Sequence, residues 1–262
     1  MGSEMCIRDS HEPDSNFPNG IPNPLLKENR PVTQKAVLSS NSDLGIAFDG
    51  DFDRCFFFDD RGDFVSGEYI VGLLSEFFLE KEKSANIVYD PRLILNSTDV
   101  IQSNGGNPIK SKTGHAFLKQ AMRKTNAVYG GEISAHHYFR DFSFCDSGMI
   151  PWLLTIELLS RKNQSLSDLV KERREKFPSS GELNFKLSYA SNLFENIHEY
   201  FKDTVKSVDY LDGISFNFDN WRFNLRTSNT EPLVRLNVET KGYWSLLHSK
   251  VDELTNIILS HE

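Results

Sequence analysis

The sequence is poor in cysteine, has no excess of positive charge and contains no long apolar run. Its three cysteines, Cys6, Cys55 and Cys145, are widely spaced and include no C-x-x-C pair, so we expect neither a disulfide framework nor a cysteine-based zinc site. The longest apolar stretch, residues 149–159, is interrupted by a proline and a glutamate and is shorter than the roughly 20 residues that cross a bilayer. We therefore expect no membrane partner and a location in a reducing cytoplasm.

Charge and the first residues exclude further classes of protein. A formal net charge of −8 is unfavourable for binding nucleic acid through its phosphates, so no nucleic-acid partner is expected. Residues 1–10 lack the apolar core of a signal peptide and do not continue into the pattern that follows, so we interpret them as a leader foreign to the fold. With 39% apolar residues in 262, the chain can bury the cores of one large or two modest domains.

The apolar pattern predicts an α/β protein. Residues 11–33 are rich in proline and have no period, and residues 44–48 predict a buried strand. An amphipathic helix with Ser66 as its N-cap follows. Short apolar strands then alternate with helical segments at 86–90, 97–102, 108–110, 115–124 and 127–130. This alternation predicts a mostly parallel, doubly wound layer.

A second, smaller unit is expected towards the C-terminus. Residues 149–161 predict one further helix, and the charged run at 171–176 followed by Phe177 indicates a domain boundary. Beyond it, apolar residues alternate or follow a helical period in the segments 183–187, 192–201, 221–225, 234–238 and 243–259. We therefore predict an α+β domain after the α/β layer.

Three aspartates follow the first predicted strand in the segment DGDFDR. Because alternate residues of an extended loop point the same way, Asp49, Asp51 and Asp53 can converge on one hard divalent cation, magnesium or calcium. An EF-hand is disfavoured, because its sixth-position glycine is Arg54 here and its twelfth-position glutamate is Asp60. A solvated acidic turn without a metal is the simpler alternative.

A second polar turn, SKTGH, lies between a predicted strand and a predicted helix. Lys112 and His115 can meet an anionic ligand where Thr113 and Gly114 open the helix N-terminus, which favours negative charge. The alternative is an ordinary helix start with an exposed lysine.

The third segment is GGEISAHHYFRDF, residues 130–142. Glu132, Ser134 and His136 alternate outward as acceptor, hydroxyl and imidazole, a set that suits the vicinal hydroxyls of a sugar. Zinc binding by the two adjacent histidines is disfavoured, because i,i+1 side chains diverge and no further ligand is placed to complete a tetrahedron. The alternative is a structural strand and turn with a buried His137.

The fourth segment is RFNLRTSNTEP, residues 222–232, between two alternating strands. Arg226 can fork onto two phosphate oxygens, and Ser228, Asn229 and Thr230 add hydroxyl, amide and backbone N–H groups. This segment therefore predicts a phosphate site, with a plain hairpin loop as the alternative.

In this order the four segments resemble the α-D-phosphohexomutase superfamily. The sequences DGDFDRC, GGEISAHHYFRDF, FCDSGMIPWLL and RFNLRTSNTEPLVRLNVE are most similar to the bacterial phosphomannomutase type, and HEPDSNFPNGIPNPL extends the likeness to residues 11–262. Two positions depart from the family pattern. Phe52 stands where glycine is common elsewhere in the superfamily, and Ser15 stands where glycine is expected in the His-Glu-Pro-Asp-Gly segment.

The resemblance implies an enzyme of four domains. This chain would hold the end of the second, doubly wound domain with the metal loop (11–63), a complete α/β third domain with a mostly parallel mixed sheet (64–176) and a smaller α+β fourth domain (177–262). The family's phosphoserine lies in a Ser-His-Asn-Pro loop of the first domain, which this sequence does not contain. Ser10 before His11 mimics that loop, but Glu12 stands in place of its asparagine, and we interpret Ser10 as a junction.

The resemblance also implies a role for each candidate residue. One magnesium ion per chain would be bound by Asp49, Asp51 and Asp53. The catalytic residues would be Arg54, near the reacting phosphate, and Lys112. The sugar hydroxyls would be bound by Glu132, Ser134 and His136. The phosphate that is not transferred would be bound by Arg226, Ser228, Asn229 and Thr230. This division is physically reasonable, because the reacting end needs charge neutralisation and the distant end needs positioning.

The implied activity is the interconversion of mannose 6-phosphate and mannose 1-phosphate through a hexose 1,6-bisphosphate that also serves as activator, for GDP-mannose and surface polysaccharide. The implied partners are the phosphosugar and the missing N-terminal domains. Because the phosphoryl carrier is not among these residues, we expect a truncated copy that is inactive alone. A non-catalytic metal- and phosphosugar-binding fragment and phosphoglucomutase specificity stay open as alternatives. A phosphatase of the haloacid dehalogenase type shares the Asp-x-Asp pattern but leaves the sugar and phosphate segments unexplained.

Overall fold

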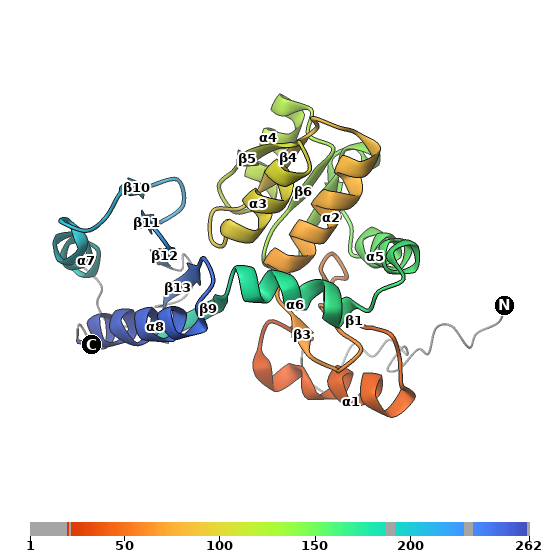
Figure 1. The fold of residues 1–262 in the computed structure, drawn as a ribbon, viewed down its shortest axis with the longest axis horizontal. Coiled ribbons are helices and arrows are strands. Elements are labelled where there is room, and N and C mark those ends of the chain that lie inside the picture. The colour runs from red at the N-terminus through yellow and green to blue at the C-terminus, as the bar shows by residue number, and fades with distance from the viewer. Residues whose placement is uncertain (1–19, 21, 187–191, 228–232, 261–262) are drawn as a thin grey trace.

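The fold is that of a computed structural model, which describes residues 20, 22–186, 192–227 and 233–260. Three of the predicted phosphate-binding residues, Ser228, Asn229 and Thr230, lie outside the described residues, as does the leader at 1–10. Three sheets organise the described chain, two of five strands and one of three. Figure 1 shows them as three groups of elements arranged around α6.

The first group is a small antiparallel sheet covered by one helix. A short 3-10 helix, η2 (Lys27–Asn29), leads into α1 (Pro31–Ser40), which packs on β1 (Gly45–Phe48) and β2 (Cys55–Phe58). The third strand is β3 (Phe64–Val65), and the order is β1-β2-β3. β1 is the strand predicted at 44–48. The sequence did not predict β2 or β3, because the fully apolar run Cys55–Phe58 carries no alternation.

The central sheet has the order β5-β4-β6-β7-β8. Its strands are β4 (Asn86–Tyr89), β5 (Asn107–Lys110), β6 (Tyr129–Gly131), β7 (His137–Phe139) and β8 (Cys145–Asp146). β4 pairs in parallel with β5 and β6, as the strand–helix alternation predicts. β7 and β8 add antiparallel pairs, because the segment after β6 folds back as a hairpin. The sheet is therefore mixed, with its parallel part at the β5 side and its antiparallel part at the β8 side.

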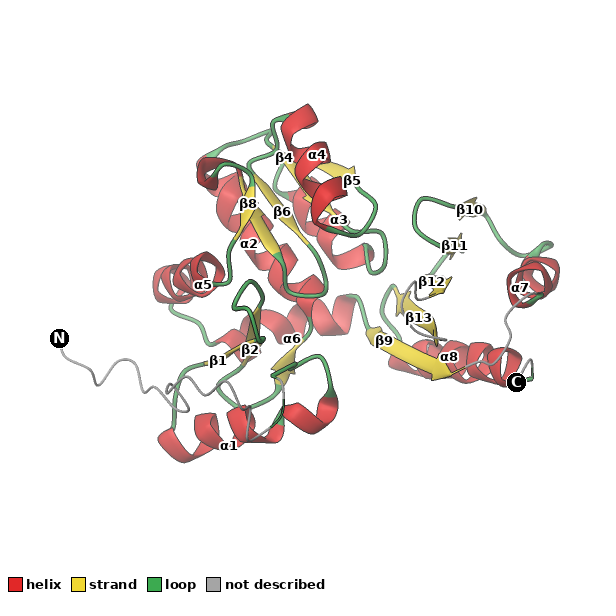
Figure 2. Ribbon diagram, turned by 180° about the vertical axis from the view of Figure 1, so that it is seen from behind, coloured by secondary structure: helices red, strands yellow, loops and turns green. Residues whose placement is uncertain are grey.

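Helices cover both faces of the central sheet (Figure 2). On one face, Ile87 and Tyr89 of β4 pack in the main core with α2 (Gly67–Lys81), beside which α3 (Leu95–Ser103) lies. On the other face, Val88 packs with α4 (His115–Thr125). Successive residues of one strand thus enter two cores, as the pleat of a buried parallel strand requires. The predicted double winding is present around β4.

The central helix α2 is more deeply buried than its sequence pattern suggests. Its predicted apolar face is inside, but Glu68 and Ser75 on other sides are also buried, because α3, α5 and α6 pack around the helix. The predicted N-cap Ser66 precedes the helix in extended conformation, yet its hydroxyl donates to the Glu68 carboxylate instead of accepting from a backbone N–H.

The charged run at 171–176 is the end of a helix, and the boundary predicted near Phe177 follows it directly. It belongs to α6 (Leu166–Lys176), which follows α5 (Met149–Lys162) and leads directly into β9 (Ser179–Lys186). Leu166 and Val170 are buried under α2, while Arg173 reaches back to Asp99 at 2.7 Å. The charges therefore lie on the outer side of an amphipathic helix.

The last group is an antiparallel sheet with two helices. Its order is β10-β11-β12-β13-β9, and every pair is antiparallel. The remaining elements are α7 (Leu193–Phe201), β10 (Ser207–Asp209), β11 (Ile214–Asn217), β12 (Trp221–Thr227), β13 (Leu233–Thr240) and α8 (Trp244–Leu259). Phe216, Phe223 and Leu236 are fully buried between the sheet and the helices. The predicted α+β unit is present here, with β10 and β11 as strands that the sequence did not predict.

A buried ion pair ties the C-terminal sheet to the central layer. Arg222 of β12 and Glu239 of β13 are joined at 2.6 Å and are both almost fully buried. The Glu239 carboxylate accepts from the backbone N–H groups of Ile94 and Leu95, where α3 begins, and Arg222 donates to the carbonyl of Arg92. A carboxylate at a helix N-terminus is favourable, so this contact fixes the orientation of the two units.

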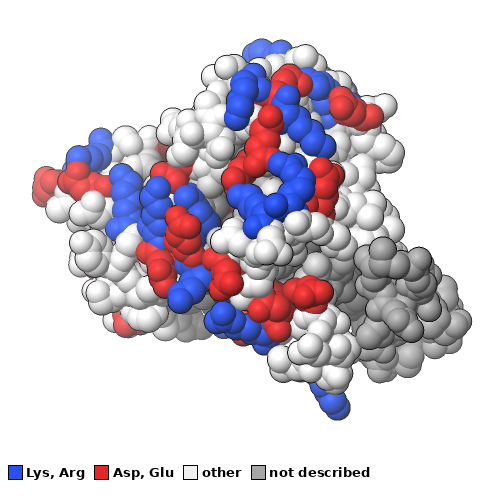
Figure 3. All heavy atoms as spheres, turned by 45° about the vertical axis from the view of Figure 1, so that its right-hand side comes forward, with Lys and Arg blue, Asp and Glu red and all other residues white. Residues whose placement is uncertain are grey.

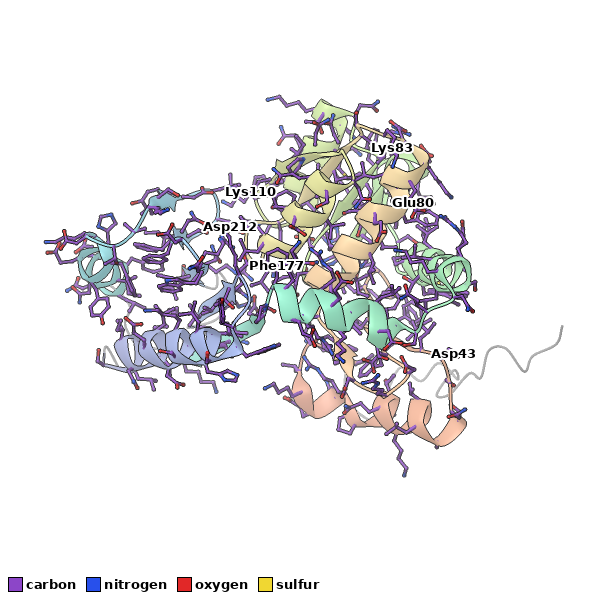
Figure 4. The ribbon with its side chains drawn as sticks, viewed as in Figure 1. Asp43, Glu80, Lys83, Lys110, Phe177 and Asp212 are labelled. Carbon is purple, nitrogen blue, oxygen red and sulfur yellow. The ribbon has the colours of Figure 1, made fainter. Side chains whose placement is uncertain are left out.

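Two further contacts close the same junction. Tyr69 in α2 donates to the carbonyl of Phe177, which Figure 4 labels where α6 passes into β9. Lys110 of β5 and Asp212 of the β10–β11 loop lie on the facing edges of the two units in Figure 4, and the N–H of Thr113 donates to Asp212 at 3.3 Å. No helix in the described residues is long and apolar enough to cross a membrane.

Candidate functional site

The acidic turn, residues Asp49–Asp53, connects β1 and β2. The carboxylates of Asp49, Asp51 and Asp53 each offer an oxygen within 4.8 Å of the other two, so the predicted convergence is present. Its cause differs from the prediction, which assumed an extended loop. The chain turns sharply instead, with the N–H of Phe52 donating to the carbonyl of Asp49 and Phe52 itself at φ 64°. Phe52 thus adopts the left-handed region that favours glycine.

The carboxylates of this turn crowd one another. Asp49 is buried and accepts from both the backbone N–H and the Nε of Arg54. The pKa of Asp53 is raised above its ordinary value, mainly by burial. His136 opposes this shift, and the neighbouring carboxylates of Asp49 and Asp51 add to it. Among the described atoms, Oδ1 of Asp53 is buried without a hydrogen-bond partner. The three carboxylates repel one another, and one oxygen of Asp53 has no hydrogen-bond donor among the described atoms. This set of oxygens therefore fits a bound cation.

The histidine hairpin, residues Glu132–His136, connects β6 and β7. Two backbone hydrogen bonds close this turn: the N–H of Glu132 donates to the carbonyl of His136, and the N–H of Ala135 donates to the carbonyl of Glu132. Ala135 has a φ of 71°, in the left-handed region. The alternation predicted for Glu132, Ser134 and His136 is wrong, because the segment is a turn and not extended. The turn nevertheless brings the three side chains together: His136 Nδ1 lies 3.2 Å from Glu132 Oε2 and 3.2 Å from Ser134 Oγ.

Glu132 is held as a buried carboxylate. Oε1 accepts from the backbone N–H of Gly114 at 2.8 Å, and Oε2 accepts from the hydroxyl of Tyr138 at 2.9 Å. Burial opposes its ionisation, but the hydrogen bond from His136 and the charge of Arg92 outweigh this, and the pKa of Glu132 is lowered to about 2. Glu132 is therefore an ionised acceptor over the whole physiological range of pH.

The acidic turn and the histidine hairpin are docked against each other. Arg54 and His136 form an isolated antiparallel β-bridge, and the N–H of Cys55 donates to the carbonyl of Ala135 at 3.2 Å. The side chains follow the backbones, since His136 Nε2 lies 3.5 Å from Asp53 Oδ2. Two segments about 80 positions apart thus share one site.

Two glycines permit this docking. A Cβ on Gly148, at the start of α5, would overlap the carbonyl oxygen of Phe52 in the acidic turn. A Cβ on Gly67, at the start of α2, would overlap the carbonyl of Ile133 in the histidine hairpin. The first turns of α2 and α5 therefore come close to the two site turns because glycine has no side chain at Gly67 and Gly148. A larger residue at either position would displace the turn that it faces.

The turn at 111–115 contributes unequally. Its Gly114 N–H holds Glu132, and His115 Nδ1 lies 3.1 Å from Asp146. The predicted catalytic Lys112 is exposed, with its ammonium 5.1 Å from the ring centroid of Phe117, and no described hydrogen bond or ion pair joins it to another predicted site residue. The structure thus brings His115 to the site more closely than Lys112.

Arg226, the described member of the predicted phosphate group, is engaged by a carboxylate. Its Nη2 donates to Glu182 Oε2 at 2.8 Å, and Arg235 also approaches Glu182 at 3.6 Å. Glu182 in turn lies 3.5 Å from Arg92, whose Nη2 donates to Ser134 Oγ at 3.3 Å. A chain of charged contacts therefore links the strand that carries Arg226 to the histidine hairpin.

Sequence reasoning missed Asp90, Arg92 and Glu182. Asp90 accepts from Nε and Nη2 of Arg92 and from the N–H of Ile133, so it fixes both the arginine and the hairpin. A signal was present, because Asp90 and Arg92 directly follow a buried parallel strand, where polar residues of α/β layers gather. Glu182 had none, since it lies in an alternating strand like any surface glutamate.

The surface charge outside the site is mixed. On the face seen in Figure 3, Lys and Arg side chains are interspersed with Asp and Glu, and no field of one sign extends over it. This face therefore offers no broad field of one sign that would attract a charged ligand.

Three family models match consecutive parts of the chain. They are described as phosphoglucomutase/phosphomannomutase alpha/beta/alpha domain II at residues 2–62, alpha/beta/alpha domain III at 66–177 and C-terminal domain at 182–254. A curated phosphomannomutase of Vibrio cholerae is 58% identical over 253 residues, which are 96% of this chain and 55% of the relative. The chain thus spans about half the length of the curated relatives it matches.

Solved structures agree with this assignment. A phosphoglucomutase/phosphomannomutase family protein from Burkholderia thailandensis superposes with a TM-score of 0.80 at 27% identity, covering 95% of this chain and 53% of that one. An N-acetylphosphoglucosamine mutase of Aspergillus fumigatus, solved in complex with glucose 1,6-bisphosphate, shares the fold with a TM-score of 0.60 at 14% identity, covering 82% and 48%.

Proposed function

The chain belongs to the phosphoglucomutase/phosphomannomutase family, and from this premise we propose that it serves the phosphomannomutase reaction, the interconversion of mannose 6-phosphate and mannose 1-phosphate through a hexose 1,6-bisphosphate. The observation that carries the proposal is the bridge between Arg54 and His136, which docks a cation-binding turn onto a hairpin of hydrogen-bonding side chains. A metal-assisted transfer between two positions of a sugar needs both functions at one place.

In this proposal the acidic turn holds one magnesium ion. Carboxylate oxygens suit magnesium, and Asp49, Asp51 and Asp53 are close enough together to share one ion. When bound, magnesium neutralises charge on a phosphoryl group. Arg54 stands at the edge of the turn with its Nε on Asp49, and we assign it to the reacting phosphate, which could accept from its terminal N–H groups.

The histidine hairpin would bind the sugar. Glu132 supplies a fixed carboxylate and Ser134 a hydroxyl, while His136 lies between the two. The contacts to Gly114 and Tyr138 keep the Glu132 carboxylate from rotating, so a sugar hydroxyl would meet a pre-oriented acceptor. Lys112, exposed in the turn at 111–115, is proposed as a contact to the substrate.

The distal phosphate would bind at Arg226, together with Ser228, Asn229 and Thr230. The guanidinium already pairs with an anionic group, Glu182, and the same charge-assisted hydrogen bonds suit a phosphate oxygen, which supports the assignment. The bisphosphate bound by the Aspergillus relative has the two phosphates that such a division of sites requires.

The organisation of the chain follows the same proposal. Residues 11–63 would be the end of the second domain of the enzyme, residues 64–176 its third domain and residues 177–262 its fourth. The products would enter GDP-mannose and polysaccharide synthesis in the cytoplasm. The sequence contains no Ser-His-Asn-Pro loop, and a first domain with that loop would supply the phosphoserine.

The test is a coupled assay of mannose 1-phosphate conversion, with magnesium and a hexose bisphosphate. The 262-residue chain is compared with the same chain fused to the N-terminal half of the Vibrio relative, and with the fusion carrying Asp51→Asn. We expect turnover in the fusion, a loss of at least ten-fold with Asp51→Asn, and none in the chain alone.

Other outcomes redirect or overturn the proposal. Faster turnover of glucose 1-phosphate than of mannose 1-phosphate would assign the chain to phosphoglucomutase specificity. An inactive fusion, with the intact relative active in parallel, would leave a metal- and phosphosugar-binding module, for which calorimetric binding of mannose 1-phosphate to the chain is the check.

A further inference from the structure

We propose that Asp53, His115 and His136 form a zinc site beside the acidic turn. The three residues come from the β1–β2 turn, the first residue of α4 and the β6–β7 turn, and each offers one ligand atom within 4.8 Å of the other two. One carboxylate oxygen and two imidazole nitrogens are ligands that suit zinc, whereas magnesium prefers oxygen alone.

The separations match those of a tetrahedral zinc site. With zinc–ligand bonds of about 2.1 Å, neighbouring ligand atoms of a tetrahedron lie roughly 3.4 Å apart. His136 Nε2 lies 3.5 Å and His115 Nε2 lies 3.8 Å from Asp53 Oδ2. Small side-chain rotations would bring all three atoms to bonding distance, and the three ligands would leave the fourth position for a water molecule.

The outer nitrogens of both histidines are already fixed by carboxylates. His115 Nδ1 lies 3.1 Å from Asp146, which Lys119 holds at 2.7 Å. His136 Nδ1 lies 3.2 Å from Glu132, which is itself fixed by its neighbours. A ligating histidine almost always gives its second nitrogen to such a partner, which sets the tautomer and raises the basicity of the ligating nitrogen. Both Nε2 atoms are thereby left to face Asp53.

Two more observations favour an ion here. Oδ1 of Asp53 is buried without a hydrogen-bond partner among the described atoms. The rings of His115 and His136 stand edge to face with centroids 4.4 Å apart, and both lie beside Tyr138, at 5.7 and 6.3 Å. The tyrosine thus packs against both rings and limits their rotation.

The sequence interpretation disfavoured zinc because it considered only the adjacent pair His136 and His137. It was correct about His137, which is fully buried and stacks on Tyr129. Nδ1 of His137 forms a 2.7 Å hydrogen bond with the Tyr129 hydroxyl. The second imidazole comes instead from His115, 21 positions before His136. Only the packing of α4 against the central sheet brings it there.

Asp53 belongs both to the proposed zinc site and to the acidic turn, so the two metal sites are coupled. Zinc bound to Asp53, His115 and His136 removes one of the three carboxylates of the acidic turn and adds a charge close to it. Zinc therefore weakens magnesium binding at that turn, and this second step rests on the proposed function of Asp49, Asp51 and Asp53.

The first experiment is a calorimetric titration of the 262-residue chain with Zn²⁺, comparing His115→Gln and His136→Gln with His248→Gln. His248 is exposed on α8, and its substitution controls for metal binding by histidines elsewhere. We expect each of the first two variants to weaken zinc binding at least ten-fold and His248→Gln to leave it unchanged. Asp146→Asn, which removes only an outer partner, should weaken binding by about ten-fold.

A second measurement guards against variants that misfold. Co²⁺ added to the unaltered chain should give the intense visible absorption of a four-coordinate ion, and Zn²⁺ should abolish it. Asp53→Asn should weaken zinc binding at least ten-fold, and Asp51→Asn, which removes a neighbouring charge but no zinc ligand, should weaken it much less. Zinc affinity that is the same in His115→Gln, His136→Gln and wild type, or a weak six-coordinate Co²⁺ spectrum, overturns the proposal.

The magnesium step is tested separately. Magnesium affinity is measured with and without stoichiometric zinc in wild type and in His115→Gln, and zinc should weaken it only in wild type. Magnesium binding that does not respond to Asp51→Asn would contradict the proposed function and leave the zinc site standing. Magnesium binding that responds to Asp51→Asn but not to bound zinc would contradict the competition.

Discussion

Arg226 donates from Nη2 to Glu182 Oε2 at 2.8 Å. The carboxylate that receives it also faces Arg92, which belongs to the central layer and touches Ser134 of the histidine hairpin. The C-terminal sheet and the hairpin therefore share one acidic residue between two arginines. In the proposed function, a phosphate that displaces Glu182 from Arg226 would leave it to Arg92 and Arg235, so phosphate binding there would change the contacts of a residue that faces the hairpin.

The first prediction concerns the dependence of stability on pH through Glu182. Burial alone would raise its pKa, but the charges of Arg92 and Arg226 outweigh this and lower it. A lowered pKa in the folded state gives stability that is present above the unfolded value of about 4.3 and is lost as the pH falls below it. Glu182→Gln should therefore lose less free energy of unfolding than wild type between about pH 5 and pH 3.

Urea unfolding at a series of pH values measures this difference. Glu172→Gln, at an exposed position of α6, is the matched control and should follow the wild-type curve. At pH 7 we expect Glu182→Gln to be less stable by about 2 kcal/mol, because Arg92, Arg226 and Arg235 lose a charged acceptor. Parallel curves for wild type and Glu182→Gln would show that the cluster does not depend on this charge.

The second prediction concerns the buried pair Arg222 and Glu239. Replacing Glu239 with Gln leaves the Arg222 guanidinium buried without its counter-charge, and removing one partner of such a pair costs about 3–5 kcal/mol. The double variant Arg222→Met/Glu239→Gln should recover part of this loss. Denaturant unfolding of wild type, Glu239→Gln, Arg222→Met and the double variant gives the coupling energy, and additive losses would contradict the ion pair as the source of the effect.

The same pair joins two units, so its loss should also be local. Limited proteolysis of Glu239→Gln should cleave between α6 and β9, near Phe177, faster than in wild type. Uniformly faster cleavage along the whole chain would indicate a general loss of stability instead.

The third prediction concerns Gly148. Its φ of −76° suits alanine, so Gly148→Ala acts only through the overlap of its Cβ with the Phe52 carbonyl. The acidic turn must shift, and magnesium affinity should fall at least ten-fold. Gly105→Ala has open space around its Cβ but a φ of 77°, so it should lower stability by about 1 kcal/mol and leave magnesium affinity unchanged. Equal magnesium affinities in both variants would refute the role of Gly148.

The fourth prediction concerns Phe52, at φ 64° and 63% exposed. Its ring centroid lies 5.6 Å from that of Phe48. A substitution can therefore change both this ring contact and the strain of the left-handed backbone. Phe52→Ala loses the ring and keeps the left-handed backbone, while Phe52→Gly loses the ring and relieves the backbone. Phe52→Gly should therefore be more stable than Phe52→Ala by about 1 kcal/mol, as thermal unfolding can measure. Equal stabilities would mean that this position carries no backbone strain.

The candidate segments were predictable because each combines a short strand with polar residues at its end. The acidic turn, the turn at 111–115 and the histidine hairpin were all identified from local sequence, and the first and third converge as residues of one site. Their local conformations were predicted less well. Both the acidic turn and the hairpin were assumed extended, because the positive φ of Phe52 and Ala135 leaves no mark in residues other than glycine.

Antiparallel strands and buried charges were harder to predict. Strands β7 and β8 follow polar segments with no clear alternation, so the change of direction after β6 was not visible. The charged run at 171–176 was interpreted only as the mark of a domain boundary, and helix α6 was not predicted, because sequence alone does not tell an outer helix face from a loop. Glu182 and Glu239 were assigned no role from the sequence, and Arg222 was only the first residue of the predicted phosphate segment, although all three join separate units.

The sequence by itself determined the strand–helix order of the central layer, the acidic turn after β1 and the family to which four ordered segments pointed. These depend on local periodicity and on residues close together in the chain. Only the tertiary structure decided that His115 joins His136 and Asp53, that Lys112 stands apart from them, and that Glu182 connects two arginines. The physical reason is that such contacts depend on how helices and turns pack across a sheet, and packing joins residues whose separation along the chain carries no signal.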